Sequence, residues 1–384
     1  MSETIHKFGR NAVALPYSLD ARLADWESLR REMVRGVAPA FTRDEWAYMV
    51  AFLDPLHLRE TFTRTFGPEA DAGIQSLWRP RGGIAIWLPN NVSLLGPLVL
   101  ILASFTGQPI RVKTGSRSDE LCGSFVEYCL AKRPPNGLKE YLASQITIQA
   151  FDRNDSRNAE MAAYASVRIA FGSDQAVAAV HAMSHPVESV GISFGNKRSE
   201  AWVRSKSLDD AQVDILLKVF AIYGQAGCTS PRRVILLDGS RNQALELRER
   251  MLQRWPLAIK RKPAMHVASS NIMSAQWNSA LGWDCKRVSE NSAVIGVGSL
   301  ERGEMNGIMA LPITWASIPE AIEQLPGNIQ TVGHLADDPE DLLAALVSAR
   351  VKRFVPLSQM HHFGPVWDGI NFWANLFEEV QVVL

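Results

Sequence analysis

The stretch at residues 223–232 reads YGQAGCTSPR, and the rest of the sequence can be interpreted outward from it. An apolar helical stretch comes before it, and an apolar stretch of strand length, residues 233–237, comes after it. A cysteine at such a junction, Cys228, can lie in a cleft among backbone N–H groups, which lower a thiol pKa and can hold an oxyanion. Cys228 is therefore a candidate nucleophile. The alternative is a buried, inert cysteine that packs as a small hydrophobic residue.

Length and composition indicate a globular protein of about two domains. The chain has 384 residues, of which 47% are hydrophobic, enough for ordinary cores. Lys plus Arg number 40 and Asp plus Glu number 40, so no overall field favours nucleic acid or a membrane surface as a partner. The four cysteines match neither a zinc pattern nor a disulfide framework; they are Cys122, Cys129, Cys228 and Cys285. We expect no metal site.

The N-terminus and the longest apolar run bear on localisation. The first ten residues have no apolar core typical of a signal peptide. The apolar run at residues 84–105 contains Pro89, Asn91 and Pro97, so it reads as strand, loop and helix rather than as a membrane span. We expect a reduced, cytoplasmic protein.

The order of apolar segments predicts an α/β fold. Residues 1–81 read as a helical segment that packs on a larger domain, with Thr42 and Glu45 forming a capping box. From residue 82, strands alternate with helices, which predicts a mostly parallel sheet of the dinucleotide-binding kind. No GxGxxG follows its first strand. The expected strands of this part are residues 84–88, 110–113, 146–151, 167–171 and 190–194, and the expected helices are 94–105, 118–132 and 174–183.

A second α/β domain is expected at residues 208–357, after the dinucleotide-binding domain at 82–207. A helix opening at Asp209 and Asp210 would deliver the Cys228 loop. We expect the tail, residues 358–384, to rejoin the dinucleotide-binding domain. The expected strands are residues 233–237, 292–297, 308–315, 330–334 and 353–357, and the expected helices are 242–254, 267–279, 318–325 and 339–349.

Several motifs between residues 82 and 371 resemble, in order, the aldehyde dehydrogenase superfamily and its LuxC-type acyl-CoA reductase branch. The branch pattern QxxCxSP matches Gln225, Cys228, Ser230 and Pro231. The resemblance implies an aldehyde dehydrogenase-like α/β fold, with a Rossmann-type parallel-sheet cofactor domain and an α/β catalytic domain. It also implies that Cys228 accepts an acyl group from a thioester.

The segment LPNNV at residues 88–92 resembles the family segment in which an Asn amide points at the reacting carbonyl oxygen. Asn91 is the matching position, so the resemblance implies an oxyanion hole formed by Asn91 and the backbone N–H of Cys228. Ser93 stands where the family has proline. The alternative is that Asn91 is only a turn residue.

Two further motifs imply cofactor binding. VKTGSR at residues 112–117 is similar to the family's V-x-K-P-S-E, which implies that Lys113 binds the adenosine ribose. Ser116 replaces the family's carboxylate and Arg117 follows, which favours NADPH over NADH on Coulomb grounds. A solvated loop is the alternative for this segment.

FGSD at residues 171–174 resembles the pyrophosphate site, with Gly172 and Ser173 at a helix N-terminus. Ser173 could also serve only as an N-cap. SFGNK at residues 193–197 aligns with the family's ELGGK, whose Glu activates water in hydrolytic members. Ser193 is no general base at neutral pH, so an acyl-enzyme should resist hydrolysis.

Together the motifs predict NADPH-dependent reduction of an acyl thioester, on CoA or on a carrier protein, to the aldehyde. One alternative is a CoA-acylating aldehyde dehydrogenase working in the oxidative direction; another is a non-catalytic acyl-carrier-binding subunit. The family implies an acid-activating ligase as a partner and a homo-oligomer formed by sheet extension. Trp367 and Asp368, in the WDG ending, are candidates to close the cleft or to pack structurally, and His361–His362 is not expected to bind metal.

Overall fold

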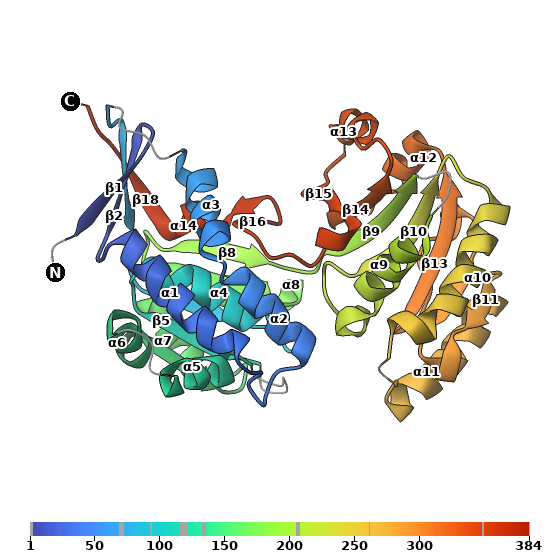
Figure 1. The fold of residues 1–384 in the computed structure, drawn as a ribbon, viewed down its shortest axis with the longest axis horizontal. Coiled ribbons are helices and arrows are strands. Elements are labelled where there is room, and N and C mark those ends of the chain that lie inside the picture. The colour runs from blue at the N-terminus through green and yellow to red at the C-terminus, as the bar shows by residue number, and fades with distance from the viewer. Residues whose placement is uncertain are drawn as a thin grey trace. The chain divides into compact units, whose positions relative to one another are not determined.

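The computed structural model describes residues 3–68, 73–92, 94–115, 121–132, 136–204, 208–260, 262–347 and 349–383. The chain forms two compact units (Figure 1). Unit 1 comprises Met1–Gly195 and Phe363–Leu384, and unit 2 comprises Asn196–His362. Residues 198–204, which the sequence-based division assigned to the dinucleotide-binding part, lie in unit 2.

Unit 1 contains a five-stranded parallel sheet of strand order β6-β5-β4-β7-β8. The central strand, β4, and its neighbour β7 are buried along their whole length, which suits continuous apolar runs covered on both faces. The strands are β4 (Ile84–Trp87), β5 (Ile110–Thr114), β6 (Ile146–Ala150), β7 (Val167–Phe171) and β8 (Val190–Phe194), and the helices are α4 (Leu95–Ser104), α5 (Leu121–Ala131), α6 (Asn136–Gln145), α7 (Arg157–Tyr164) and α8 (Asp174–Ala182). The five strands confirm the sequence prediction, whereas α6 and α7 were not predicted.

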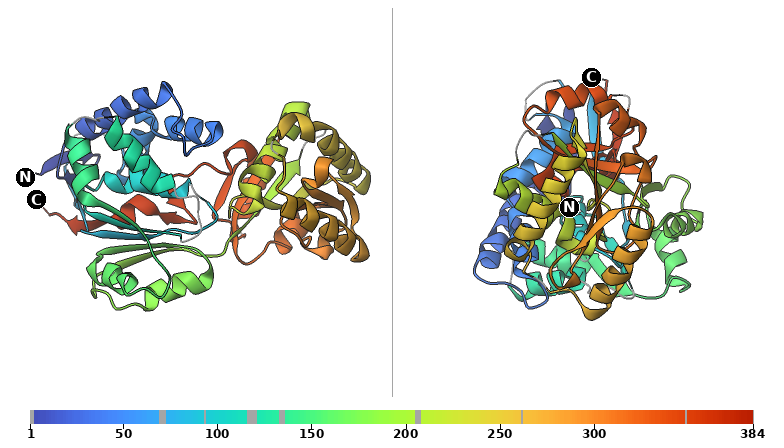
Figure 2. Two further views of the ribbon diagram at one scale, coloured as in Figure 1. Left: turned by 90° about the horizontal axis from the view of Figure 1, so that it is seen from below. Right: turned by 90° about the vertical axis from the view of Figure 1, so that its right-hand side faces the viewer.

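A second sheet of unit 1 joins the two ends of the chain. It has four strands in the order β1-β2-β3-β18, and both termini lie beside it (Figure 2). These strands are β1 (Thr4–Phe8), β2 (Asn11–Leu15), β3 (Ser76–Pro80) and β18 (Phe377–Gln381), and the helices between β2 and β3 are α1 (Leu19–Val34), α2 (Arg43–Phe52) and α3 (Pro55–Phe66). The expectation of a mostly helical N-terminal segment is therefore incomplete. A two-residue turn with Gly9 at φ 58° closes the β1–β2 hairpin, and the capping box of Thr42 and Glu45 is confirmed.

Unit 2 is built on a seven-stranded sheet of order β11-β12-β13-β10-β9-β14-β15, parallel except for β11. The strands are β9 (Arg198–Arg204), β10 (Pro231–Leu237), β11 (Asp284–Arg287), β12 (Val294–Val297), β13 (Ala310–Ala316), β14 (Ile329–Ala336) and β15 (Arg353–Pro356). The helices are α9 (Asp210–Ala221), α10 (Arg241–Ala258), α11 (Met265–Ala280), α12 (Ile318–Glu323) and α13 (Glu340–Leu346). The sequence prediction missed β9 and β11. The architecture of both units confirms the α/β fold class.

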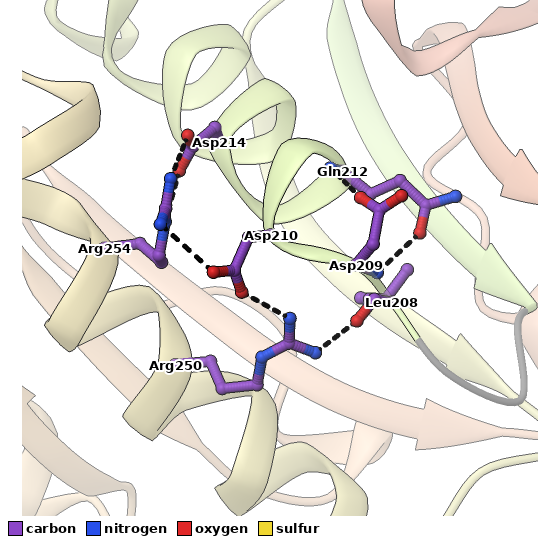
Figure 3. A network of polar contacts seen from close by, with 7 residues as sticks. All are labelled: Leu208, Asp209, Asp210, Gln212, Asp214, Arg250 and Arg254. Atoms are coloured by element: carbon purple, nitrogen blue, oxygen red, sulfur yellow. Dashed lines mark hydrogen bonds and ion pairs between the residues drawn. The ribbon is translucent and has the colours of Figure 1, made fainter.

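The helix that delivers the Cys228 loop, α9, is held against α10 by arginine–aspartate pairs (Figure 3). Arg254 reaches both Asp214 and Asp210, and Arg250 pairs with Asp210 at 2.9 Å. The N-cap of α9, Asp209, forms a capping box, so the predicted start of this helix is confirmed. None of the helices in the described part of the chain is long and apolar enough to cross a membrane.

Candidate active site

The Cys228 loop leaves α9 through a short 3₁₀ turn, η1 (Ile222–Gln225), and enters β10. Tyr223, Gly224 and Gln225 all have a positive φ, of 58°, 58° and 60°. A left-handed conformation is unfavourable for residues other than glycine. The surrounding contacts must therefore stabilise this reversal of the chain.

Gln225 supplies the main stabilising contacts, because its buried side chain ties the loop to two strands. Its Nε2 donates to the carbonyl oxygens of Pro231 at 3.3 Å and Ala310 at 3.0 Å. Its Oε1 accepts from the backbone N–H of Ala310 at 3.2 Å. The sequence identified Gln225 only as part of a motif, and these contacts give it a structural role.

Cys228 is a half-buried cysteine whose backbone is fixed on the carbonyl side. The hydroxyl of Ser199 on β9 donates to the Cys228 carbonyl at 2.7 Å. The register of the sheet explains this contact, since Ser199 pairs with Pro231, three residues beyond the cysteine. The thiol is thus neither fully exposed nor sealed in a core.

The next residue, Thr229, is held by a histidine from the end of unit 2. Thr229 Oγ1 lies 2.7 Å from His361 Nδ1, and His361 Nε2 lies 2.8 Å from the carbonyl oxygen of Val219 on α9. Burial lowers the pKa of His361 to about 4, against the smaller raising effect of the Val219 contact. The ring is therefore neutral at ordinary pH, with Nε2–H donating to Val219 and Nδ1 accepting from Thr229. This role was not predicted from the sequence.

In unit 1, Asn91 lies on an exposed bend between β4 and α4. Its neighbour Asn90 is packed against Gly115, the residue after β5: a Cβ at position 115 would lie 1.7 Å from Asn90 Oδ1. The loops after β4 and β5 therefore touch at the carboxyl edge of the parallel sheet. That edge is where open α/β sheets bind their ligands.

Lys113, near the end of β5, is at the same edge. Its Nζ donates to the carbonyl oxygen of Thr114 at 3.2 Å and lies 5.4 Å from the ring centroid of Phe151. Partial burial lowers the pKa of Lys113, and the nearby carboxylate of Asp152 opposes that shift. The other two residues predicted for this segment, Ser116 and Arg117, lie outside the described residues.

Gly172 and Ser173 connect β7 to α8, again at the carboxyl edge. The N–H of Gly172 donates to the carbonyl of Phe194 at 3.1 Å. Ser173 is the N-cap of α8, its hydroxyl accepting from Ala176 N–H at 3.3 Å, and it is exposed. A Cβ at Gly172 would meet that of Ala176 at 3.3 Å, so glycine keeps this approach to the helix open.

Ser193, at the position aligned with the family's general base, has a partner that the sequence did not reveal. Its hydroxyl contacts Nε2 of His181 from α8. Gly191 leaves room for that ring, since a Cβ there would lie 2.4 Å from His181 Cε1. Burial is the main reason that the pKa of His181 is lowered, with Arg168 and His185 adding to it.

The WDG ending forms a tight hairpin of unit 1, with β16 (Val366–Trp367) paired to β17 (Ile370–Asn371). Asp368 and Gly369 occupy its two-residue turn with φ of 53° and 75°, as in a type I′ turn. Trp367 is buried and packs on Phe363, the ring centroids being 4.8 Å apart. These contacts give Trp367 a packing role.

At one sheet edge of unit 1 the structure thus places Lys113 on β5 and, in the loops, Asn91, Gly172 and Ser173. Cys228 lies in unit 2, with Thr229 and His361 beside it. The sheet edge of unit 1 is suited to holding a phosphate group, and the loop of unit 2 presents a positioned thiol.

Comparison with known proteins gives a consistent result. A family model described as "Acyl-CoA reductase (LuxC)" matches residues 23–378. No curated protein matches. Among solved structures, the Streptococcus pyogenes succinic semialdehyde dehydrogenase, in complex with NADP+ as the cofactor, superposes with a TM-score of 0.68 at 15% identity, covering 95% of this chain and 90% of that one. For aldehyde dehydrogenase 21 from Physcomitrella patens, in complex with the product succinate, the TM-score is 0.70 at 14% identity, covering 96% and 86%. At such identities the likeness establishes an aldehyde dehydrogenase-like fold.

Proposed function

Since the chain belongs to the LuxC acyl-CoA reductase family, we propose that it reduces an acyl thioester to the aldehyde through an acyl–Cys228 intermediate, with NADPH as reductant. The family and the fold make it an aldehyde-related oxidoreductase. The observation that carries the finer proposal is the Cys228 loop. Its flanking residues are held by Gln225, Ser199 and His361, while the thiol itself remains half-buried.

The first step is acyl transfer. The Cys228 thiolate attacks the thioester carbon, the carbon–oxygen π bond becomes an oxyanion, and the oxyanion collapses with departure of the CoA or carrier thiolate. The Asn91 amide and the Cys228 backbone N–H are the proposed oxyanion donors. One such donor is worth about 3 kcal/mol in a transition state.

The second step is reduction of the acyl–Cys228 thioester. The nicotinamide cofactor supplies, when bound, the hydride that the acyl carbon accepts. The resulting hemithioacetal oxyanion, held by the same donors, expels the Cys228 thiolate and leaves free aldehyde. The thiol is thereby regenerated for another cycle.

The residues at the carboxyl edge of unit 1 fit such a cofactor. Gly172 and the exposed, capped N-terminus of α8 suit a pyrophosphate. We propose that Lys113 binds the adenosine ribose; the Gly115–Asn90 contact next to it leaves no room for a side chain at position 115. Preference for NADPH rests on Ser116 and Arg117, which replace a carboxylate with a hydroxyl and add a cation.

Retention of the acyl group until reduction depends on position 193. A hydroxyl stands where hydrolytic relatives have a carboxylate, and it contacts Nε2 of His181, whose pKa burial lowers. We therefore propose slow hydrolysis of the acyl–Cys228 link. The acyl donor is CoA or a carrier protein, an acid-activating ligase is the proposed partner, and oligomers would form by sheet extension.

The test is oxidation of NADPH by a panel of acyl-CoA thioesters, with aldehyde identified as product. Cys228→Ala should abolish turnover, whereas Cys122→Ala, which removes a buried thiol of α5, should retain it. Mass spectrometry without NADPH should find the acyl group on Cys228. A wild-type protein inactive on every acyl thioester, or a Cys228→Ala variant at full rate, would contradict the proposal. If the wild type oxidises aldehyde with CoA and NADP+ faster than it reduces the acyl-CoA with NADPH, the oxidative alternative is supported instead.

A further inference from the structure

The four residues Gly227, Cys228, Thr229 and Ser230 form a tight turn at the candidate nucleophile. The N–H of Ser230 donates to the carbonyl oxygen of Gly227 at 3.0 Å, which closes the turn. Neither Cys228 nor Thr229 is among the residues with a positive φ, so the turn is of type I. In this right-handed conformation the N–H groups of the two central residues point to the same side of the chain, as they do in the first turn of a helix.

Within this turn, the backbone N–H of Thr229 is a donor without a protein acceptor. Thr229 is only 5% exposed. Over the part of the chain that the structure describes, its N–H donates to no carbonyl and to no side chain. Nearly all backbone N–H groups of buried residues have an acceptor in native proteins. The N–H of Thr229 is therefore available to a bound group.

The glycine at position 227 is the reason that this N–H is not capped. The first residue of a type I turn is commonly Asp, Asn or Ser, whose side-chain oxygen accepts from the N–H two residues later. Gly227 has no side chain that could do so. The sequence thus leaves the donor open at the residue that directly follows the candidate nucleophile.

The peptide unit between Cys228 and Thr229 is held from both sides. The hydroxyl of Ser199 donates to its carbonyl oxygen at 2.7 Å, and Oγ1 of Thr229 lies 2.7 Å from Nδ1 of His361. The C=O and N–H of a planar trans peptide point in opposite directions, so the Ser199 contact also directs the Thr229 N–H away from β9. A donor fixed before the reaction is the kind that stabilises a transition state most.

We propose that the backbone N–H of Thr229 is an oxyanion donor in acyl transfer to Cys228, an inference that rests on the proposed function. Covalent geometry keeps the Thr229 nitrogen within roughly 5 Å of Cys228 Sγ, whichever rotamer the thiol adopts. The oxygen of an acyl group bonded to that sulfur is two bonds further on, so it can reach the N–H. Unit 2 then supplies this donor from the turn itself, in addition to the amide proposed for Asn91.

The experiment compares two reactions of the same thiol in the full chain. With p-nitrophenyl acetate, the Cys228 thiolate attacks the ester carbon and an oxyanion forms; the new C–S bond then replaces the C–O bond as p-nitrophenolate leaves with the bonding pair. With iodoacetamide, the thiolate displaces iodide from a saturated carbon and no oxyanion forms. Loss of an oxyanion donor should therefore slow only the first reaction. Cys228→Ala gives the background of both.

Two variants address the Thr229 N–H. Incorporating the α-hydroxy acid analogue of threonine at position 229 turns the amide into an ester, which removes the N–H and keeps the side chain beside His361. Gly227→Asn adds a side-chain oxygen that can accept from the N–H, at the cost of small shifts of neighbouring side chains. Each should lower the acylation rate by about 100-fold or more and leave the alkylation rate within about 3-fold. Gly327→Asn, at an exposed glycine where a Cβ meets nothing within 4 Å, is the matched control and should keep both rates.

Circular dichroism and melting temperature check that each variant is folded, and the ester variant decides if Gly227→Asn is not. An ester variant that is acylated at the wild-type rate would overturn the inference and leave the proposed function standing. If acylation and alkylation fall together in the ester variant, the change acts on the thiol rather than on an oxyanion, which also overturns it. A wild type that neither p-nitrophenyl acetate nor any acyl-CoA acylates at Cys228 would overturn the proposed function, and this inference with it.

Discussion

Replacing Gln225 with leucine tests whether its side chain holds the Cys228 loop. The change keeps the approximate size but removes the two bonds donated to Pro231 and Ala310 and the one accepted from Ala310. A buried group left without its partner costs about 1–3 kcal/mol. Each carbonyl oxygen has a second lone pair for another hydrogen bond, so losing the Gln225 contact costs it less. We therefore expect the free energy of unfolding to fall by about 3 kcal/mol in total. For a unit of this size, that corresponds to a fall in melting temperature of roughly 6–12 °C.

The assay combines calorimetry with the rate at which iodoacetamide alkylates Cys228. Gln225→Leu should melt earlier and should change the alkylation rate at temperatures where the protein is still folded. Gln324→Leu, at an exposed glutamine of the same unit, should do neither. If Gln225→Leu matches the wild type in both measurements, the three hydrogen bonds do not position the loop and the reasoning is refuted.

Three further changes have defined outcomes. Ser193→Glu should increase the fraction of acyl groups released as free acid at least 10-fold, by restoring a general base, and Ser193→Ala should not; equal acid release from both would contradict the role of this position. Arg233→Met should destabilise the protein by about 3–5 kcal/mol because Glu200 remains buried without its ion-pair partner. In urea unfolding, the double variant with Glu200→Leu should recover most of that loss, and an unrecovered loss would refute the ion-pair explanation. Because the native pKa of His361 is about 4 against an ordinary 6.5, the unfolded state binds the extra proton first, and stability should fall as pH drops through that window. His361→Asn should reduce this loss of unfolding free energy, measured in urea, by at most about 3 kcal/mol. A pH dependence of stability unchanged by the substitution would contradict the role assigned to His361.

The sequence predicted the parts of the fold whose apolar pattern is local. β4 and β7 are buried throughout, and their continuous apolar runs place them correctly. The N-terminal β1 and β2 escaped prediction because both are short, β1 is partly exposed, and β3, which pairs with β2, is distant in sequence. Strand formation there depends on pairing that no local pattern records.

The candidate site was predictable only where a motif matched. Cys228 and Gln225 lie in one loop, so a short pattern includes both. His361 and Thr229 are 132 positions apart in the sequence. A histidine and a threonine at that separation form no pattern from which the contact could be predicted. The partner of Ser193 was missed for a related reason: His181 comes from a helix that reads from the sequence as ordinary helical surface.

One of the strands that the sequence pattern failed to predict, β9, connects these observations. It lies near the middle of the sheet yet carries buried polar residues, which hides the apolar alternation on which prediction depends. Those residues have separate uses on its two faces: Ser199 holds the Cys228 carbonyl, and Glu200 pairs with Arg233 of β10. A wholly apolar β9 would be easier to recognise and could stabilise the sheet equally well, but the Cys228 carbonyl would then lose the Ser199 hydroxyl. The departure from the usual strand pattern therefore lies where the candidate nucleophile needs support, as expected when function competes with foldability.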